Sequence, residues 1–220
     1  MTIFENQKNV CVLVAHPDDE AMFFTPIIKQ VCGEGNKVYV LCLTNGDYYG
    51  LGKLREKELL EACNALGILR DRIRVVSNDK FQDQPNEKWP YTDVISEIES
   101  FVDEFNIDII LTFDEFGISG HINHISTNES VKEWIQGSKR EKYPKVYVLE
   151  TSNIFIKYSG ILSLLYLYIF PKNECLLAKS LNPIYSLKAL LCHKSQVTWY
   201  RIIFTLFSQY SYLNILKCIN

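Results

Sequence analysis

The chain has 220 residues, which is enough to bury the core of one domain with a terminal extension. Hydrophobic residues make up 47% of the chain, so intrinsic disorder is excluded as its default state. The formal net charge of −3 argues against a general nucleic-acid-binding protein.

The first 150 residues alternate β-branched runs with helical patterns, which is typical of an α/β fold: a Rossmann-like, mostly parallel sheet flanked by helices. The predicted strands are Val10–Ala15, Lys37–Leu43, Ile73–Val76, Asp108–Thr112 and Lys145–Leu149. The predicted helices are Asp19–Cys32, Leu51–Leu66, Thr92–Phe105 and His121–Ile135, with a loop at Pro85–Pro90. We expect a single domain over 1–220, in which a helical, aromatic-rich extension (151–220) packs on a catalytic core (1–150).

The charge is distributed unevenly along the chain. Residues 1–146 carry 16 Lys and Arg against 24 acidic residues, whereas residues 147–220 carry 7 against 2. The second segment also holds 13 of the 28 aromatic residues. Two interpretations stay open: a basic, aromatic segment that faces an anionic membrane surface, or a helical segment that simply packs on the body.

Targeting signals and a disulfide framework are not predicted. The N-terminal residues lack the apolar core of a signal peptide, and the longest uncharged apolar run, Ile161–Phe170, is far shorter than the ~20 residues that span a bilayer. We therefore expect a soluble or peripheral protein. The seven cysteines are odd in number, form no CxxC pair and lie partly in apolar runs, so we expect small buried residues in a reducing compartment.

An acidic motif directly follows the first predicted strand: Ala15-His16-Pro17-Asp18-Asp19-Glu20. Ligands of open parallel sheets bind beyond the carboxyl ends of the strands, so these side chains lie where a site is expected. An aspartate that only caps the next helix is the alternative. A cap needs one short polar residue, however, and does not need a histidine with two carboxylates.

A second motif, Gly117-Ile118-Ser119-Gly120-His121-Ile122-Asn123-His124, follows the strand Asp108–Thr112. An HxxH pair alone is a weak signal, because exposed or satisfied histidines are common. Three of the four histidines of the chain nevertheless lie in these two motifs, and both motifs should open onto the same sheet edge. Two histidines and one aspartate form the ligand set of a catalytic zinc site with an open position.

Four segments together carry a family resemblance: AHPDDE, LTNGDYYG, LREKELLEACNALGI and TFDEFGISGHINH. In these segments the chain resembles the PIG-L/LmbE family of zinc de-N-acetylases. The later segments LETSNIFIKYSG and HKSQVTWYRIIFTLFSQYSYLN are similar to the eukaryotic branch, whose members deacetylate N-acetylglucosaminyl-phosphatidylinositol in the second step of glycosylphosphatidylinositol (GPI) anchor synthesis. The resemblance runs from about residue 10 to about residue 215.

The resemblance implies a role for each matching residue. His16, Asp19 and His124 correspond to metal ligands, with zinc expected and iron, cobalt or manganese compatible with such ligands. Asp18 corresponds to the general base that takes a proton from the attacking water. His121 corresponds to the group that stabilises the tetrahedral intermediate, and amide hydrolysis suggests a protonated imidazole there. The substrate-binding candidates are Arg55 and, more weakly for support or substrate contact, Asp114, Asn123 and His193.

The resemblance also implies partners and location. The substrate would be a glycolipid whose phosphodiester favours basic partners, for which Lys53, Arg55, Lys194 and Arg201 are candidates. The protein would act at the cytoplasmic face of the endoplasmic reticulum membrane as a peripheral protein; its oligomeric state stays open. Two alternatives remain: a soluble deacetylase of another N-acetylglucosamine conjugate, and a non-enzymatic binding module, which lacks support because no GxGxxG loop follows the first strand.

Overall fold

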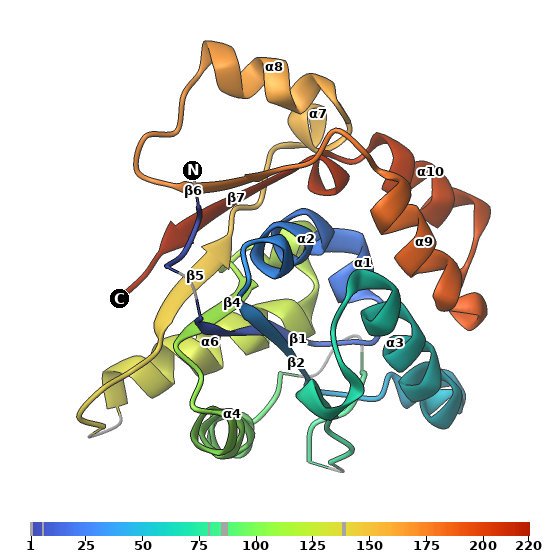
Figure 1. The fold of residues 1–220 in the computed structure, drawn as a ribbon. Coiled ribbons are helices and arrows are strands. Elements are labelled where there is room, and N and C mark those ends of the chain that lie inside the picture. Colours follow the sequence, from blue (N-terminus) through green and yellow to red (C-terminus); the bar gives the residue numbers. More distant parts are fainter. Residues whose placement is uncertain (1, 6, 79, 85–87, 138–139) are drawn as a thin grey trace.

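The computed structural model describes residues 2–5, 7–78, 80–84, 88–137 and 140–220. A seven-stranded sheet forms its centre, in the order β3-β2-β1-β4-β5-β7-β6 (Figure 1). The strands are β1 (Asn9–Val14), β2 (Lys37–Cys42), β3 (Ile73–Val75), β4 (Ile109–Phe113), β5 (Lys145–Leu149), β6 (Leu176–Lys179) and β7 (Leu213–Cys218). The first five strands pair in parallel, whereas β7 pairs antiparallel with β5 and with β6.

Helices cover both faces of this sheet (Figure 1). Helices α4 and α6 pack against each other on one face, and α2, α3 and α9 contact one another on the opposite face. The α-helices are α1 (Asp19–Phe23), α2 (Thr25–Gly33), α3 (Gly52–Leu66), α4 (Tyr91–Phe105), α5 (Gly117–Gly120), α6 (Ile122–Gly137), α7 (Ile154–Lys157), α8 (Leu162–Ile169), α9 (Ile184–Cys192) and α10 (Trp199–Phe207). Short 3₁₀ turns lie at Asp47–Tyr49, Arg70–Arg72, Lys194–Gln196 and Gln209–Ser211. The predicted α/β class and the five predicted strands are therefore confirmed. Residues 85–87 of the predicted loop lie outside the described residues.

The core follows from the sequence pattern of buried parallel strands. All residues of β4 and five of the six residues of β1 and of β2 are buried, because helices cover both sides. Cys11, Cys42 and Cys63 are buried among them, as predicted, whereas Cys32, Cys175 and Cys192 are partly buried and Cys218 is exposed, against that prediction. The strand order reverses between β1 and β4, so the two motif-bearing loops leave neighbouring strands at this switch point.

The predicted helix over 19–32 is interrupted at Phe24, where α1 ends and α2 begins. Pro26 lies in the first turn of α2; it has no N–H to continue the hydrogen bonds of α1. The side chain of Asn214 replaces the missing bonds: its Oδ1 accepts from Ile27 N–H at 3.1 Å, and its Nδ2 donates to the carbonyl of Phe23 at 2.8 Å. A strand residue far along the chain therefore holds the junction of α1 and α2.

The prediction for residues 151–220 was incomplete, because this segment also contributes β6 and β7 to the sheet. Their apolar residues did not alternate clearly enough with polar ones to separate strand from helix. No helix in the described part of the chain is both long and apolar enough to cross a bilayer.

Candidate active site

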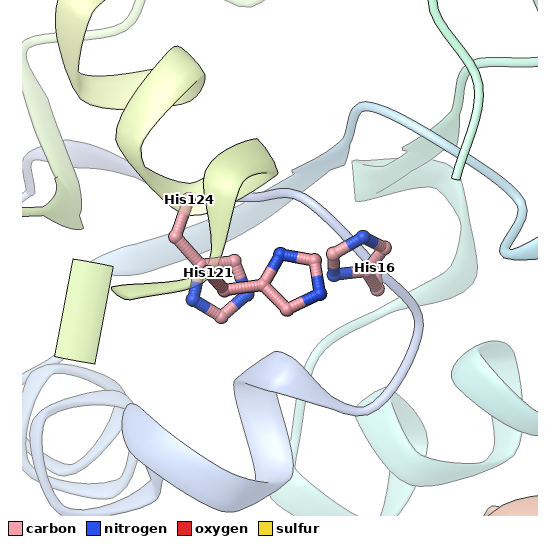
Figure 2. A group of neighbouring side chains, drawn as sticks. All are labelled: His16, His121 and His124. Atoms are coloured by element: carbon pink, nitrogen blue, oxygen red, sulfur yellow. The ribbon is translucent and has the colours of Figure 1, made fainter. Parts of the chain in front are cut away.

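Three imidazole rings converge where the loops after β1 and β4 meet. His16 comes from the loop after β1, His121 lies directly before α6, and His124 lies in the first turn of α6 (Figure 2). One ring nitrogen of each histidine lies within 4.8 Å of the corresponding atoms of the other two. His121 is not helical, with φ −67° and ψ 122°, so the expectation of a helix that begins at His121 is wrong by one residue.

Asp19 completes this cluster. Its Oδ1 lies 3.2 Å from Nε2 of His124, and its Oδ2 lies 3.6 Å from Nδ1 of His16. The backbone N–H groups of Ala15 and His16 donate to Oδ2 at 3.1 and 2.8 Å, which fixes the carboxylate. Nε2 of His124 is buried without a hydrogen bond of suitable geometry, as expected of an atom that faces an ion. The donor set, imidazole nitrogen and carboxylate oxygen, fits a divalent transition metal.

The electrostatics of the cluster also fit a cation. Burial alone would lower the pKa of His16, but hydrogen bonds to Asp19 and Asp83 outweigh it and raise this pKa to about 9. Burial alone would raise the pKa of Asp19, but His124 and His16 hold it well below its usual value. The carboxylates of Asp19 and Asp83 thus favour a positive charge at His16. A metal ion bound there would take the place of that charge and release a proton.

His121 has the opposite electrostatic environment. Burial, and then repulsion from His16 and His124, lowers its pKa to about 4. This lowered pKa favours the neutral ring near pH 7. A neutral imidazole still donates one N–H, so this finding leaves a hydrogen-bonding role open to His121.

Several contacts orient the histidines. The ring of His124 stacks on Phe113 with centroids 3.9 Å apart, and its Nδ1 lies 3.1 Å from the carbonyl of Gly117. Nε2 of His16 lies 3.0 Å from Nδ2 of Asn123 and 3.2 Å from Oδ1 of Asp83. Such contacts fix tautomer and ring orientation in metal sites. Asn123, a predicted site residue, thus contacts His16, whose Nε2 accepts the amide N–H only when the imidazole is neutral.

Asp18 lies beside the cluster in a strained backbone conformation. Its φ of 126° is rare for a residue with a side chain, and Ile118 in the facing loop also has a positive φ, of 64°. Each such conformation costs about 1–3 kcal/mol and persists only where surrounding contacts enforce it. The carboxylate of Asp18 forms an ion pair with Arg201 of α10, and its Oδ1 lies 3.7 Å from Nη2 of Arg55.

These side chains line one open cleft of about 380 Å³. Its lining residues are His16, Asp18, Asp19, Met22, Phe23, Tyr48, Tyr49, Arg55, Asp83, Ser119, His121, His124, Gln196 and Arg201. All five residues predicted for catalysis and metal binding, together with Arg55, are therefore brought together. The guanidinium of Arg55 is largely engaged by protein: it donates to the carbonyls of Pro17 and Gly46 at 2.8 and 3.0 Å and forms an ion pair with Asp83.

Asp114 and His193 do not line the cleft. Asp114 accepts from the backbone and hydroxyl of Thr151, each at 2.6 Å, and from the N–H of Gly117, so it holds the loop after β4. His193 is buried, with Nε2 2.6 Å from Oε1 of Glu20. Both candidates lie behind the cleft, where they contact loop backbone or another buried side chain.

Sequence reasoning missed Asp83 and Glu20 as parts of the site. Asp83 contacts both His16 and Arg55. It lies in a segment rich in Asp, Asn, Gln and Pro with no motif, so no signal in the sequence singled it out. Glu20 stood inside the first motif, but its buried partner His193 is 173 residues away.

Comparisons with known proteins identify the fold and the family of this chain. The fold matches N,N'-diacetylchitobiose deacetylase from Pyrococcus horikoshii with a TM-score of 0.68 and 19% identity, over 100% of this chain and 86% of that chain. The chain thus has the Rossmann-like fold of that structure, and the switch point of its sheet carries a His/Asp cluster suited to a metal ion. The family model described as "PIG-L: GlcNAc-PI de-N-acetylase" matches residues 11–135, and the chain belongs to this family.

Curated relatives agree with this assignment. The chain is 36% identical over 239 aligned positions to a protein of Dictyostelium discoideum called probable N-acetylglucosaminyl-phosphatidylinositol de-N-acetylase, covering 96% of this chain and 93% of the relative. It is 33% identical to the N-acetylglucosaminyl-phosphatidylinositol de-N-acetylase of Bos taurus, covering 94% of this chain and 81% of the relative. The resemblance inferred from the motifs is therefore confirmed.

Proposed function

We propose that this protein hydrolyses the acetamide of N-acetylglucosaminyl-phosphatidylinositol to give glucosaminyl-phosphatidylinositol and acetate, the second step of GPI-anchor synthesis. The observation that carries the proposal is the convergence of His16, His121 and His124 with Asp19 in one cleft that also contains Asp18. The similarity to curated deacetylases of this glycolipid supports the choice of substrate.

In this proposal His16, Asp19 and His124 hold the metal ion, which we take to be zinc. Such an ion lowers the pKa of water to roughly 7 and polarises a carbonyl. Asp18 takes the proton of the attacking water, a contribution of about 10²–10⁴-fold in typical enzymes. His121 donates an N–H to the oxyanion of the tetrahedral intermediate. The proton that Asp18 has taken from the water then passes to the leaving amine.

The proposed substrate suggests where the protein acts and which side chain binds the phosphodiester. A phosphatidylinositol glycolipid resides in a membrane, so we place the protein at a membrane surface, at the cytoplasmic face of the endoplasmic reticulum. Its free cysteines suit a reducing environment. Arg201, which reaches the cleft from α10, is the basic side chain best placed for the phosphodiester.

The test is acetate release from the purified protein with N-acetylglucosaminyl-phosphatidylinositol, measured with and without a chelator and after zinc is restored. We expect turnover that the chelator abolishes and zinc restores. A water-soluble N-acetylglucosamine conjugate serves as the comparison substrate. Faster turnover of that conjugate than of the lipid would contradict the assigned substrate, and turnover that survives full metal removal would contradict the metal site.

A further inference from the structure

Helix α10 has an apolar face on the outside of the molecule. Trp199, Tyr200, Ile203 and Phe207 are exposed, with Trp199 at 74%. The inner side of the helix carries buried Thr205 and also Arg201, which turns to Asp18. A surface helix normally exposes its polar face, whereas the exposed side of α10 is apolar, in addition to the inner side that packs Phe204 against Phe23 of α1.

The neighbouring helices α7 and α8 repeat this arrangement. Phe155 on α7 is 86% exposed and Tyr168 on α8 is 85% exposed. Helix α8 contains no charged residue. The other exposed apolar side chains are Ile154 on α7, Leu162, Leu165 and Ile169 on α8, and Tyr158 and Ile161 between the two helices.

The helices form one continuous surface. The ring of Tyr158 packs edge-on against Phe204 of α10, with centroids 5.9 Å apart. Gly160, which precedes α8, packs against the backbone of Phe207: a Cβ there would lie 3.4 Å from its carbonyl oxygen. Figure 1 shows α7 and α8 on the same side of the molecule, with α10 beside them. We call the exposed apolar residues of α7, α8 and α10 and the residue Ile161 the apolar face.

The apolar face adjoins the mouth of the cleft. Lys157 of α7 donates to the carbonyl of Ile118 at 3.1 Å, in the loop that carries His121. Arg201 of α10 lines the cleft itself. A surface that contacts α7 and α10 therefore lies next to the entrance through which a substrate reaches the histidines.

The charge of the segment favours an anionic surface. Residues 151–220 carry seven Lys and Arg and one acidic residue, Glu174, although the whole chain has a net charge of −3. Lys157, Arg201 and Lys172 turn to Ile118, Asp18 and Glu150, whereas the exposed lysines of the segment are Lys179, Lys188, Lys194 and Lys217. Trp and Tyr beside aliphatic side chains are typical of helices that lie in the membrane interface, and the exposed lysines of the segment favour an anionic one. A protein partner would also bury apolar residues, but it would not by itself require this excess of basic charge.

We propose that the apolar face docks on an anionic phospholipid bilayer and holds the cleft at the headgroup level. The role of this docking rests on the proposed function. The sugar of a lipid-anchored substrate lies close to the membrane surface, and docking through the apolar face would bring the histidines to it. The docking itself needs no catalysis.

Vesicle flotation tests the docking. The full-length protein is mixed with phosphatidylcholine vesicles that contain or lack phosphatidylinositol. We expect the wild type to float with both, and more with the anionic vesicles. The double variant Phe155→Ser/Trp199→Ser should bind about tenfold or more weakly, because each removed side chain would have been buried in the interface. The matched control, Leu54→Ser/Leu69→Ser, removes two exposed apolar side chains elsewhere and should float like the wild type.

Activity assays separate docking from catalysis. The Phe155→Ser/Trp199→Ser variant should keep its turnover of a substrate analogue without acyl chains and lose turnover of the lipid in vesicles. A wild type that does not float, or a double variant that floats like the wild type, overturns the proposal. So does a wild type that self-associates through this face, with the double variant monomeric and neither form floating. Flotation without any deacetylation would instead contradict the proposed function and leave the docking intact.

Discussion

Nε2 of His193 lies 2.6 Å from Oε1 of Glu20, and neither side chain is exposed to solvent. The other carboxylate oxygen of Glu20 accepts the backbone N–H of Asp18 at 3.1 Å. This pair therefore anchors the strained backbone of Asp18 from behind the cleft. His193 comes directly after α9, so a residue of the segment 151–220 fixes the geometry of the first motif.

The first prediction concerns the stability that this pair provides. His193→Gln should lower the free energy of unfolding by about 3 kcal/mol below pH 6.5, because it leaves Glu20 buried without a charged partner. Burial alone would lower the pKa of His193, but Glu20, Asp18 and Glu58 raise it above its usual value. The stabilisation is thus fully present below the unfolded pKa of about 6.5 and is lost as pH rises through the raised pKa.

Denaturant unfolding of the wild type and His193→Gln at several pH values measures this difference. The gap in unfolding free energy should narrow as the pH increases. Lys194→Gln, at the exposed next position, is the matched control and should change stability by less than about 0.5 kcal/mol. A gap that widens with pH would show that the pair does not carry the stabilisation.

The second prediction separates metal binding from proton transfer. Asp18→Asn should retain bound metal and lose about 10²–10⁴-fold in turnover, because an amide cannot accept the proton. His124→Ala should lose both metal and activity. Metal content by elemental analysis and acetate release measure the two effects, and Asp71→Asn, an exposed aspartate, is the control. Full turnover by Asp18→Asn would refute its assigned role.

The third prediction decides which side chains hold the ion, since four candidates meet at the cluster. If His16, Asp19 and His124 are the ligands, Asp19→Ala loses the metal, whereas His121→Ala keeps it and loses most of its turnover. Metal content after dialysis measures this without reference to activity. The reverse result, loss of metal from His121→Ala and retention by Asp19→Ala, would favour the three-histidine set.

The fourth prediction concerns Arg55, which is buried and donates to the carbonyls of Pro17 and Gly46. Arg55→Lys should lower the free energy of unfolding by about 2 kcal/mol, because an ammonium group does not reproduce the planar fork of donors. Thermal unfolding measures the loss, with Arg70→Lys at an exposed position as control. Unchanged stability with a raised KM would instead support direct substrate binding by Arg55.

The sequence predicted the parallel half of the fold well. Buried runs such as Val10–Ala15 are short, continuous and rich in valine, which is typical of a covered parallel strand, and two motifs placed at strand ends predict a shared site. The strands β6 and β7 were missed, because their residues lack a clear period and their pairing depends on contacts with β5. The break at Phe24 depends on Asn214, which no local pattern connects to it.

The candidate site, like the fold, was predicted from the sequence only in part. His16, Asp19, His121 and His124 were found because metal chemistry needs few residue types at short spacings. Asp83 was not found, because its contact with His16 arises only from tertiary folding. Sequence motifs thus identified the histidines and the aspartate that converge in the cleft, whereas the structure was needed to identify Asp83 beside them.

Because Asn214 holds the α1–α2 junction, the order in which the chain is synthesised determines when the cleft can form. During synthesis, the turn that bears Asp19 is made early, but the amide that secures its helix is translated almost two hundred residues later. The nascent chain on the ribosome therefore lacks a finished catalytic cleft, and competence for hydrolysis arrives only when β7 has left the exit tunnel and joined the sheet.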